Sequence, residues 1–367
     1  MAKQIQLFYP NVSRAAKEAV QKVLYSRFIG QGPKVDEFEE LWYQKISKPN
    51  KAIAVGSGTD ALHLAYILAG IKEGDEVIAP IFTCTATNIP LLYQKAKIVF
   101  ADVKKNNLNI DPVDVKHKIN KWTKAIVCVD YGGLPADLDE LKNIANYFGI
   151  PLIEDAAQAH GAMYKGQMVG SIADFTCFSF QAIKIITTGD GGMLTIKDHE
   201  LEQKAKRIRW FGIDREAKLQ DRWQNDITEL GYKYQMTDIA ASMGIEGLKL
   251  LRKTWMYHSL LFSVYEEELK GIPGITFIGD DKDHTSACWL ATVLVRDREK
   301  LKAKLAKHGI ESNQVHYRND IYSIFGGRVN DCPNMDILES QYLVLPMHFG
   351  LNVEDITNIC KIIRRGW

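Results

Sequence analysis

The stretch Ser179–Gly192 reads S-F-Q-A-I-K-I-I-T-T-G-D-G-G and places one lysine, Lys184, between the hydroxyl-bearing end of a strand and a cluster of glycines. Earlier in the chain, the apolar run Pro151–Asp155 ends in a carboxylate. Such a run is typical of a buried strand that carries its last side chain to the edge of a sheet. A further strand, Phe175–Phe178, is predicted between the two segments. The sequence therefore predicts a sheet edge that presents both Asp155 and Lys184.

Strand and helix patterns alternate on both sides of this stretch. Apolar runs that predict strands occur at 51–55, 76–79, 98–103, 125–129, 152–155, 175–178 and 193–196. Helical periodicity occurs between them, at 59–69 and 139–148. This alternation is typical of an α/β fold in which helices cover both faces of a mostly parallel sheet.

The pattern changes after about residue 250. The elements predicted there are a helix, two strands and a second helix, at 258–269, 275–278, 289–295 and 298–308. They indicate a smaller α+β domain. At 367 residues, the chain also exceeds the length at which a single core usually divides. We therefore predict a large domain over residues 1–250 and a small C-terminal domain over residues 251–367.

Composition and charge exclude several classes of protein. The 46 Lys and Arg residues balance the 45 Asp and Glu residues, so the net charge of +1 gives no field that would attract nucleic acid or an anionic membrane. The six cysteines include no C-x-x-C pair, so we predict neither a metal site nor a disulfide framework. Met1–Gln6 lacks the apolar core of a signal peptide, and no apolar run is long enough to cross a bilayer. We expect a cytoplasmic protein.

A lysine and an aspartate in this relation suit pyridoxal phosphate (PLP). The Lys184 amine can form a Schiff base with the cofactor aldehyde, while the Asp155 carboxylate keeps the pyridine nitrogen protonated, so that the ring draws electrons from the substrate. A buried carboxylate also needs a positive partner, because burying an unpaired charge is costly. The alternatives are a capping Asp155 and a solvated Lys184, and both are disfavoured by the apolar, tight segments around them.

A second motif, Gly56–Thr59, lies where a predicted strand turns into a helix. Backbone N–H groups and the hydroxyls of Ser57 and Thr59 can face an anion there, at the positive end of the helix dipole. A phosphate fits this turn, although either hydroxyl could instead serve only as a helix cap. In the turn after Asp155, Gln158 could bond the ring hydroxyl of PLP, and for His160 we favour a buried core histidine.

Three motifs together resemble the DegT/DnrJ/StrS family, the PLP-dependent nucleotide-sugar aminotransferases of fold-type I. They are Gly56–Leu62, Glu154–Gly161 and Ser179–Gly192. The segments Gly30–Pro33 and Leu345–His348 resemble the family's N-terminal and C-terminal substrate-side segments, so the resemblance covers nearly the whole chain. It implies a mostly parallel seven-stranded sheet flanked by helices, and a homodimer with active sites at the subunit interface.

The resemblance also implies roles for individual residues. Lys184 would bind PLP covalently, Asp155 would contact the pyridine nitrogen and Gln158 the ring oxygen. The phosphate would be held by Ser57, Gly58, Thr59 and Ser179.

Two positions depart from the family pattern. Cys84 stands where the family often stacks an aromatic residue on the PLP ring, so either Cys84 packs there alone or Phe82 compensates. Lys233 stands where relatives place an asparagine that reaches the phosphate of the partner subunit. Lys233 could replace that contact or be a solvated lysine.

On the substrate side, the resemblance points to Gln31, His316 and Arg318. Arg318 could pair with a substrate phosphate, since its fork of donors matches phosphate oxygens, or form a surface salt bridge. Phe8 and Tyr9 are expected to be core or subunit contacts.

The implied activity is transfer of an amino group from glutamate to a nucleotide-linked keto sugar, with pyridoxamine phosphate as the intermediate form of the cofactor. Residues 180–192 are most similar to perosamine and viosamine synthase-like members, which aminate C4 of a 4-keto-6-deoxy sugar for polysaccharide biosynthesis. A 3-keto substrate stays open. Members that dehydrate the sugar at C3 have histidine at the position of Lys184, so the lysine favours transamination. Lys184 and Asp155 together also disfavour a non-catalytic, regulatory member.

Overall fold

The computed structural model of the chain describes residues 4–217, 224–279 and 282–367. Its main element is a seven-stranded sheet. The strands are β1 (Lys51–Val55), β2 (Glu76–Pro80), β4 (Lys97–Ala101), β5 (Thr123–Val129), β6 (Leu152–Asp155), β9 (Phe175–Ser179) and β10 (Gly192–Ile196). Each of them corresponds to a strand predicted from the sequence.

The strands follow the order β1-β10-β9-β6-β5-β2-β4. β10 is antiparallel to β1 and β9, and the remaining neighbours pair in parallel. The predicted α/β fold with a mostly parallel seven-stranded sheet is therefore confirmed. Because β6 and β9 are parallel neighbours, their carboxyl ends lie at the same edge of the sheet, with Asp155 opposite Cys177.

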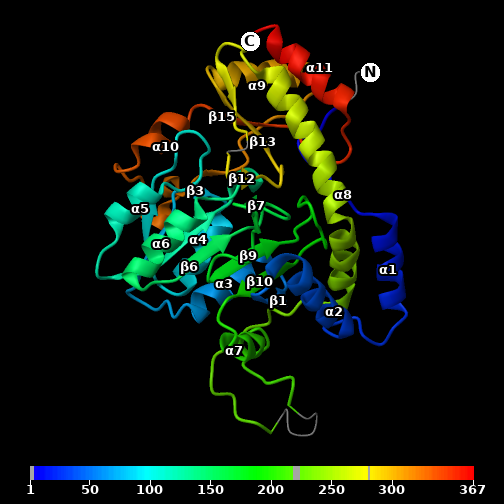
Figure 1. The fold of residues 1–367 in the computed structure, drawn as a ribbon, viewed down its shortest axis with the longest axis vertical. Coiled ribbons are helices and arrows are strands. Elements are labelled where there is room, and N and C mark those ends of the chain that lie inside the picture. The colour runs from blue at the N-terminus through cyan, green and yellow to red at the C-terminus, as the bar shows by residue number, and fades with distance from the viewer. Residues whose placement is uncertain (1–3, 218–223, 280–281) are drawn as a thin grey trace.

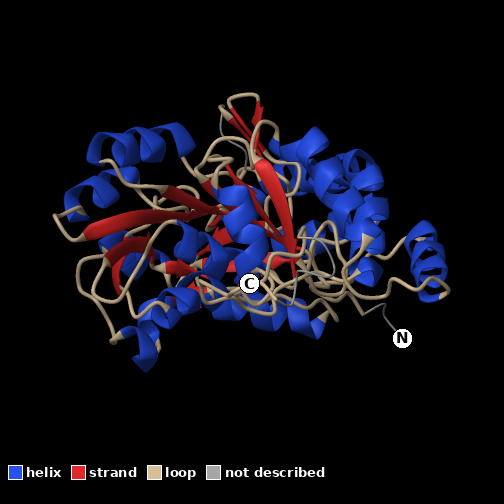
Figure 2. Cartoon of the chain, turned by 90° about the horizontal axis from the view of Figure 1, so that it is seen from below, coloured by secondary structure: helices blue, strands red, loops and turns tan. Residues whose placement is uncertain are grey.

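Helices cover both faces of this sheet, as Figure 2 shows. One face packs against α3 (Gly58–Leu68), α4 (Thr85–Tyr93) and α7 (Leu201–Ile208). The other packs against α2 (Pro33–Trp42), α5 (Pro112–Lys118) and α6 (Leu138–Phe148). Side chains along a strand alternate between faces, so Ile53 and Val55 join the first core while Ala52 and Ala54 join the second.

A long helix, α8 (Asp238–Leu269), connects the sheet to the C-terminal part of the chain (Figure 1). Its N-terminal half packs into the core of the large sheet through Ala241 and Ile245, with α1 (Arg14–Leu24) alongside. Its C-terminal half, which is the helix predicted at 258–269, belongs to a separate core through Leu261 and Tyr265. The helix runs continuously through residue 250, and the division of the chain at that residue stays a prediction.

That separate core belongs to a three-stranded antiparallel sheet in the order β11-β13-β15. Its strands are β11 (Ile275–Phe277), β13 (Ala291–Val295) and β15 (Tyr342–Leu345). Two helices cover it, α9 (Arg298–Lys307) and α11 (Val353–Arg364).

Two small sheets and a short helix complete the fold. One sheet joins β12 (His284–Thr285), β7 (Met163–Tyr164) and β8 (Gln167–Met168). The other pairs β14 (Tyr317–Arg318) with β3 (Phe82–Thr83), and α10 (Pro333–Leu338) follows it in the chain. The β14–β3 pair brings the segment that contains His316 to the same edge of the large sheet as Lys184 and Asp155.

Candidate active site

Lys184 lies in the loop between β9 and β10, and backbone hydrogen bonds fix the shape of this loop. The N–H of Lys184 donates to the carbonyl of Gln181 at 2.9 Å, and the N–H of Thr188 donates to the carbonyl of Phe180 at 2.9 Å. Past the lysine, the Ile186 N–H donates to Nδ1 of His160 at 3.2 Å. His160 is therefore buried beside the lysine loop, where it holds the backbone two residues beyond Lys184.

Asp155 ends β6 and is buried at the same sheet edge. The Thr87 hydroxyl of α4 donates to its Oδ2 at 2.6 Å, and the Ala157 N–H donates to Oδ1 at 3.1 Å. Burial raises the pKa of Asp155, and these two hydrogen bonds and the charge of Lys184 oppose the rise only in part. The carboxylate thus remains short of positive partners, and a protonated pyridine nitrogen would supply one.

The pKa of the Lys184 amine is shifted in the opposite direction. Burial lowers its pKa to about 8, while the charges of Asp155 and Cys84 act to raise it. A buried amine with that pKa is partly neutral at physiological pH, so it can attack an aldehyde and later carry a proton. The structure therefore brings Lys184, Asp155 and Cys84 together, with Cys84 at the start of α4.

Gln158 and His316 form a third part of the site. The Gln158 amide receives the Gly132 N–H on Oε1 at 2.8 Å, and its Nε2 lies 3.1 Å from Nε2 of His316. Burial, together with the charge of Lys184, lowers the pKa of His316 to about 3. The same two causes lower the pKa of His160 to about 3. Both imidazoles are therefore neutral and add no positive charge next to the lysine.

The turn at Gly56–Thr59 begins α3 as predicted. Ser57 caps the helix by accepting the Asp60 N–H on Oγ at 3.0 Å, and its side chain also hydrogen-bonds the Asp60 carboxylate. Gly58 packs directly on Ser179, since a Cβ at position 58 would lie 2.7 Å from the Ser179 Cβ. The structure thus joins Ser57, Gly58 and Ser179 around the helix N-terminus, and Thr59 follows in the first turn of α3.

One important residue of the site was missed by the sequence reasoning. The Nζ of Lys184 lies 3.7 Å from the ring centroid of Trp289. Trp289 was predicted as the first residue of a strand, but β13 starts at Ala291 and Trp289 lies in the loop before it. Phe8 stacks on this ring at a centroid distance of 5.7 Å, so Phe8 also borders the site. No motif or spacing in the sequence indicates that these segments meet.

The contacts of three other predicted residues, Gln31, Lys233 and Phe82, do not involve Lys184. Gln31 accepts a hydrogen bond from Arg215 at 2.6 Å and lines a separate polar hollow. Lys233 lies over the ring of Phe211, with 5.5 Å between Nζ and the centroid. Phe82 is fully buried and packs against core tyrosines, so its ring is not free to stack on a cofactor in place of Cys84.

The prediction that Arg318 binds a substrate phosphate is wrong. Its guanidinium is fully buried and donates to both carboxylate oxygens of Asp320, at 2.6 and 2.7 Å. It also pairs with Asp336 and, at 3.4 Å, with Glu339. The competing prediction of a salt bridge is correct for the pairing, although Arg318 and Asp320 are buried. Only the outer partners Asp336 and Glu339 reach the surface, at 43% and 33% exposure. The charge of Arg318 is already neutralised by carboxylates of its own chain.

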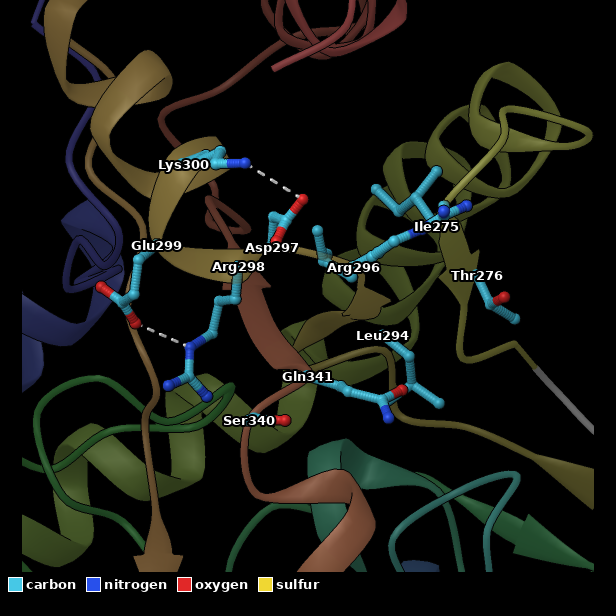
Figure 3. A pocket seen from close by; sticks show the side chains of 12 residues that line it. Ile275, Thr276, Leu294, Arg296, Asp297, Arg298, Glu299, Lys300, Ser340 and Gln341 are labelled. Carbon is cyan, nitrogen blue, oxygen red and sulfur yellow. Dashed lines mark hydrogen bonds and ion pairs between the residues drawn. The ribbon is translucent and has the colours of Figure 1, made fainter.

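The hollow drawn in Figure 3 is a different one from the site at Lys184. It lies at the edge of the small sheet, beside α9. Two ion pairs join charged side chains that line it, Arg298 with Glu299 and Lys300 with Asp297. Neither Lys184 nor Asp155 lines it. The described residues also include no group of three or more His, Cys, Asp or Glu side chains placed to hold a metal ion.

The chain is similar to known aminotransferases over nearly its whole length. Residues 10–364 match the model of the DegT/DnrJ/EryC1/StrS aminotransferase family. The chain is 31% identical to GDP-perosamine synthase from Escherichia coli O157:H7, with 98% of each chain covered. It is also 31% identical to UDP-4-amino-4-deoxy-L-arabinose–oxoglutarate aminotransferase from Shewanella sediminis, over 98% of this chain and 97% of that protein.

Among solved structures, the sugar aminotransferase CalS13 from Micromonospora echinospora superimposes with a TM-score of 0.93 at 30% identity, over 99% of this chain and 100% of CalS13. The chain belongs to the DegT/DnrJ/EryC1/StrS aminotransferase family. The family, the enzyme class of aminotransferase and the cofactor PLP are thereby confirmed as predicted. In the part of the chain that the structure describes, no helix is both long and apolar enough to span a membrane.

The contact between Gly58 and Ser179 predicts the effect of a methyl group in the Gly56–Thr59 turn. Gly58→Ala places Cβ 2.7 Å from the Ser179 Cβ, so the turn must move away from β9. We expect PLP affinity to fall at least about tenfold, because the donors around the helix N-terminus no longer converge. Fluorescence titration with PLP measures the effect. Gly30→Ala is the control, since its Cβ meets nothing within 4 Å, and equal affinities of the two variants would contradict the prediction.

The network around Arg318 predicts a large loss of stability when the cation is removed. Arg318→Met leaves Asp320 buried without its partner, and we expect the free energy of unfolding to fall by about 3–5 kcal/mol. Arg328 contacts the outer carboxylates of the same network but is 46% exposed, so Arg328→Met should cost less than about 1 kcal/mol. Urea unfolding compares the two variants. A small effect at position 318 would show that its charge is not structural.

The lowered pKa of Lys184 predicts how PLP capture depends on pH. Only the neutral amine attacks the aldehyde, so the rate of covalent capture should rise about tenfold per pH unit at low pH. It should level off above the amine pKa of about 8. Stopped-flow absorbance of PLP mixed with the cofactor-free protein measures this rate, with Lys184→Ala as the blank. A rate that still rises beyond pH 10 would indicate an ordinary, solvated lysine.

Proposed function

We propose that this aminotransferase moves an amino group from glutamate to C4 of a nucleotide-linked 4-keto-6-deoxy sugar, giving a 4-amino-4,6-dideoxy sugar. The observation that carries the proposal is the buried amine of Lys184, with a pKa of about 8, under the influence of the Asp155 carboxylate. The name of the Shewanella relative supports both the 4-amino position and oxoglutarate as the product of the donor. The name of the Escherichia relative supports a perosamine-type product.

Each residue of the site has a task in this proposal. Ser57, Gly58, Thr59 and Ser179 hold the phosphate of PLP at the N-terminus of α3, where free N–H groups and hydroxyls meet. Asp155 pairs with the pyridine nitrogen and thereby gains the cation that its buried carboxylate lacks. Gln158 is already oriented by the Gly132 N–H and can donate to the ring oxygen. Cys84, which precedes α4 and acts on the charge of the Lys184 amine, would border the ring of PLP with a small side chain.

PLP, when bound, supplies the electron sink that makes a proton on the reacting carbon removable. Lys184 would take that proton and return it at the neighbouring atom. The proton would move in one direction with the amine donor and in the opposite direction with the sugar. A pKa of about 8 suits both directions, because the amine is neither fully protonated nor fully neutral near pH 7 to 8. His316, neutral and held next to Gln158, faces the same space and can hydrogen-bond the sugar without adding charge.

We further propose that the working form is a homodimer in which Gln31 and Lys233 serve the site of the partner subunit. Within its own chain, Gln31 contacts Arg215 and Lys233 lies over Phe211, and neither contact involves the lysine loop. Large apolar side chains near these segments are exposed in the single chain, among them Tyr25, Ile29 and Leu230. Burial of such side chains against a second subunit would stabilise the dimer.

The function is tested by incubating the protein and PLP with glutamate and a panel of GDP-, dTDP- and UDP-linked 4-keto and 3-keto sugars. We expect equimolar amino sugar and 2-oxoglutarate from a 4-keto member, detected by mass spectrometry. Lys184→Ala should lose at least about 1000-fold in rate, whereas Lys197→Ala, an exposed lysine of the same region, should retain full activity. Products from 3-keto sugars alone would refute C4 amination, and no product from any sugar would refute the sugar substrate.

A further inference from the structure

The amine of Lys184 rests on an aromatic face. Its Nζ lies 3.7 Å from the ring centroid of Trp289, a distance at which the electron-rich face attracts a cation. Trp289 is 2% exposed and Lys184 is partly buried, so little water competes for this ring face. The ring is thus in direct contact with the lysine head group.

Trp289 is held firmly in this position. Its Nε1–H donates to the carbonyl of Ile183 at 2.9 Å, one residue before the lysine. Phe8 from the N-terminal segment stacks on it, with an interplanar angle of 18°, and His316 stacks at a centroid distance of 6.4 Å. One side chain thus contacts both the backbone next to Lys184 and the end of its side chain.

The groups around the amine come from several elements. Asp155 at the end of β6 and Cys84 at the start of α4 favour the charged amine. His160, beside the lysine loop, and His316, before β14, are neutral. The hydrogen bonds of Thr87 and Ala157 to the Asp155 carboxylate disperse its charge. An ammonium group at this place therefore needs a further partner, and the ring of Trp289 is in contact with it.

We propose that Trp289 is a positioning residue that holds the free amino group of Lys184 as an ammonium ion at the place the structure shows. The inference rests on the proposed role of Lys184, whose amine must be free while it carries a proton. An aromatic face suits this task because it attracts a cation but cannot accept its proton. A second carboxylate would bind the ammonium more tightly and raise the pKa of the amine above the range in which proton transfer is easy.

The test titrates Lys184 in the cofactor-free protein, so it does not depend on turnover. Competitive acetylation with acetic anhydride across a pH series, read for the Lys184 peptide by mass spectrometry, gives the midpoint of the amine titration. The protein is made with tryptophan and with mono-, di- and trifluorinated tryptophan. Fluorine withdraws electron density from the ring face with little change in shape, and so weakens its attraction for a cation.

We expect the midpoint to fall stepwise with fluorination, by about one pH unit for the trifluorinated residue, because the charged form loses its partner. The matched control is Trp289→Phe made with the same tryptophans, in which the midpoint should not respond to fluorine. A midpoint that stays constant or rises in the natural sequence overturns the proposal, and so does an equal fall in the control. Since no sugar or amine donor is present, failure of the proposed aminotransferase reaction would leave this result unaffected.

Discussion

The site depends on the Lys184 amine and the Asp155 carboxyl, two groups of opposite charge whose pKa values are shifted in opposite directions by burial. Removal from water lowers the pKa of the Lys184 amine to about 8 and raises the pKa of the Asp155 carboxyl. Each charge partly offsets the free-energy cost of burying the other. Thr87 and the Ala157 N–H add hydrogen bonds to the Asp155 carboxylate, and these act to lower its pKa again. Neither charge is therefore fully neutralised by the other, and both groups remain able to react with a cofactor.

The topology explains why these two groups meet. β6 and β9 are adjacent and parallel, so the side chain at the end of β6 and the loop that follows β9 emerge at one edge of the sheet. The reversed strand β10 then returns the chain, and its start at Gly192 pairs with Ser179 at the end of β9. A Cβ at Gly192 would lie 2.3 Å from the carbonyl oxygen of Ser57, so the Gly56–Thr59 turn and the start of β10 pack backbone against backbone. Glycine at this position permits that approach.

The local parts of the structure could be predicted from the sequence, because strand periodicity and the strand-to-helix turns are written in neighbouring residues. The strands of the large sheet and the places of Lys184, Asp155 and Ser57 follow from such patterns. Trp289 could not be found in this way, since its contact with Lys184 joins segments more than a hundred residues apart and no repeat or motif marks it. The prediction for Arg318 failed for a different reason. Its bidentate partner Asp320 is only two residues away, but the burial of this pair depends on the fold. The further partners Asp336 and Glu339 lie on a separate short helix and its end.

Arg318 and Lys184 show how partners decide whether a buried cation is structural or reactive. Arg318 has carboxylates on several sides, which raise its pKa further, and a guanidinium so paired can neither lose its proton nor leave its place without a large cost. Lys184 has one buried carboxylate in its neighbourhood, neutral imidazoles and an aromatic ring. The Lys184 ammonium group can therefore lose its proton. The same burial that fixes the arginine as part of the scaffold makes the lysine a group that can exchange a proton, and the difference lies in the number of carboxylates that each cation contacts.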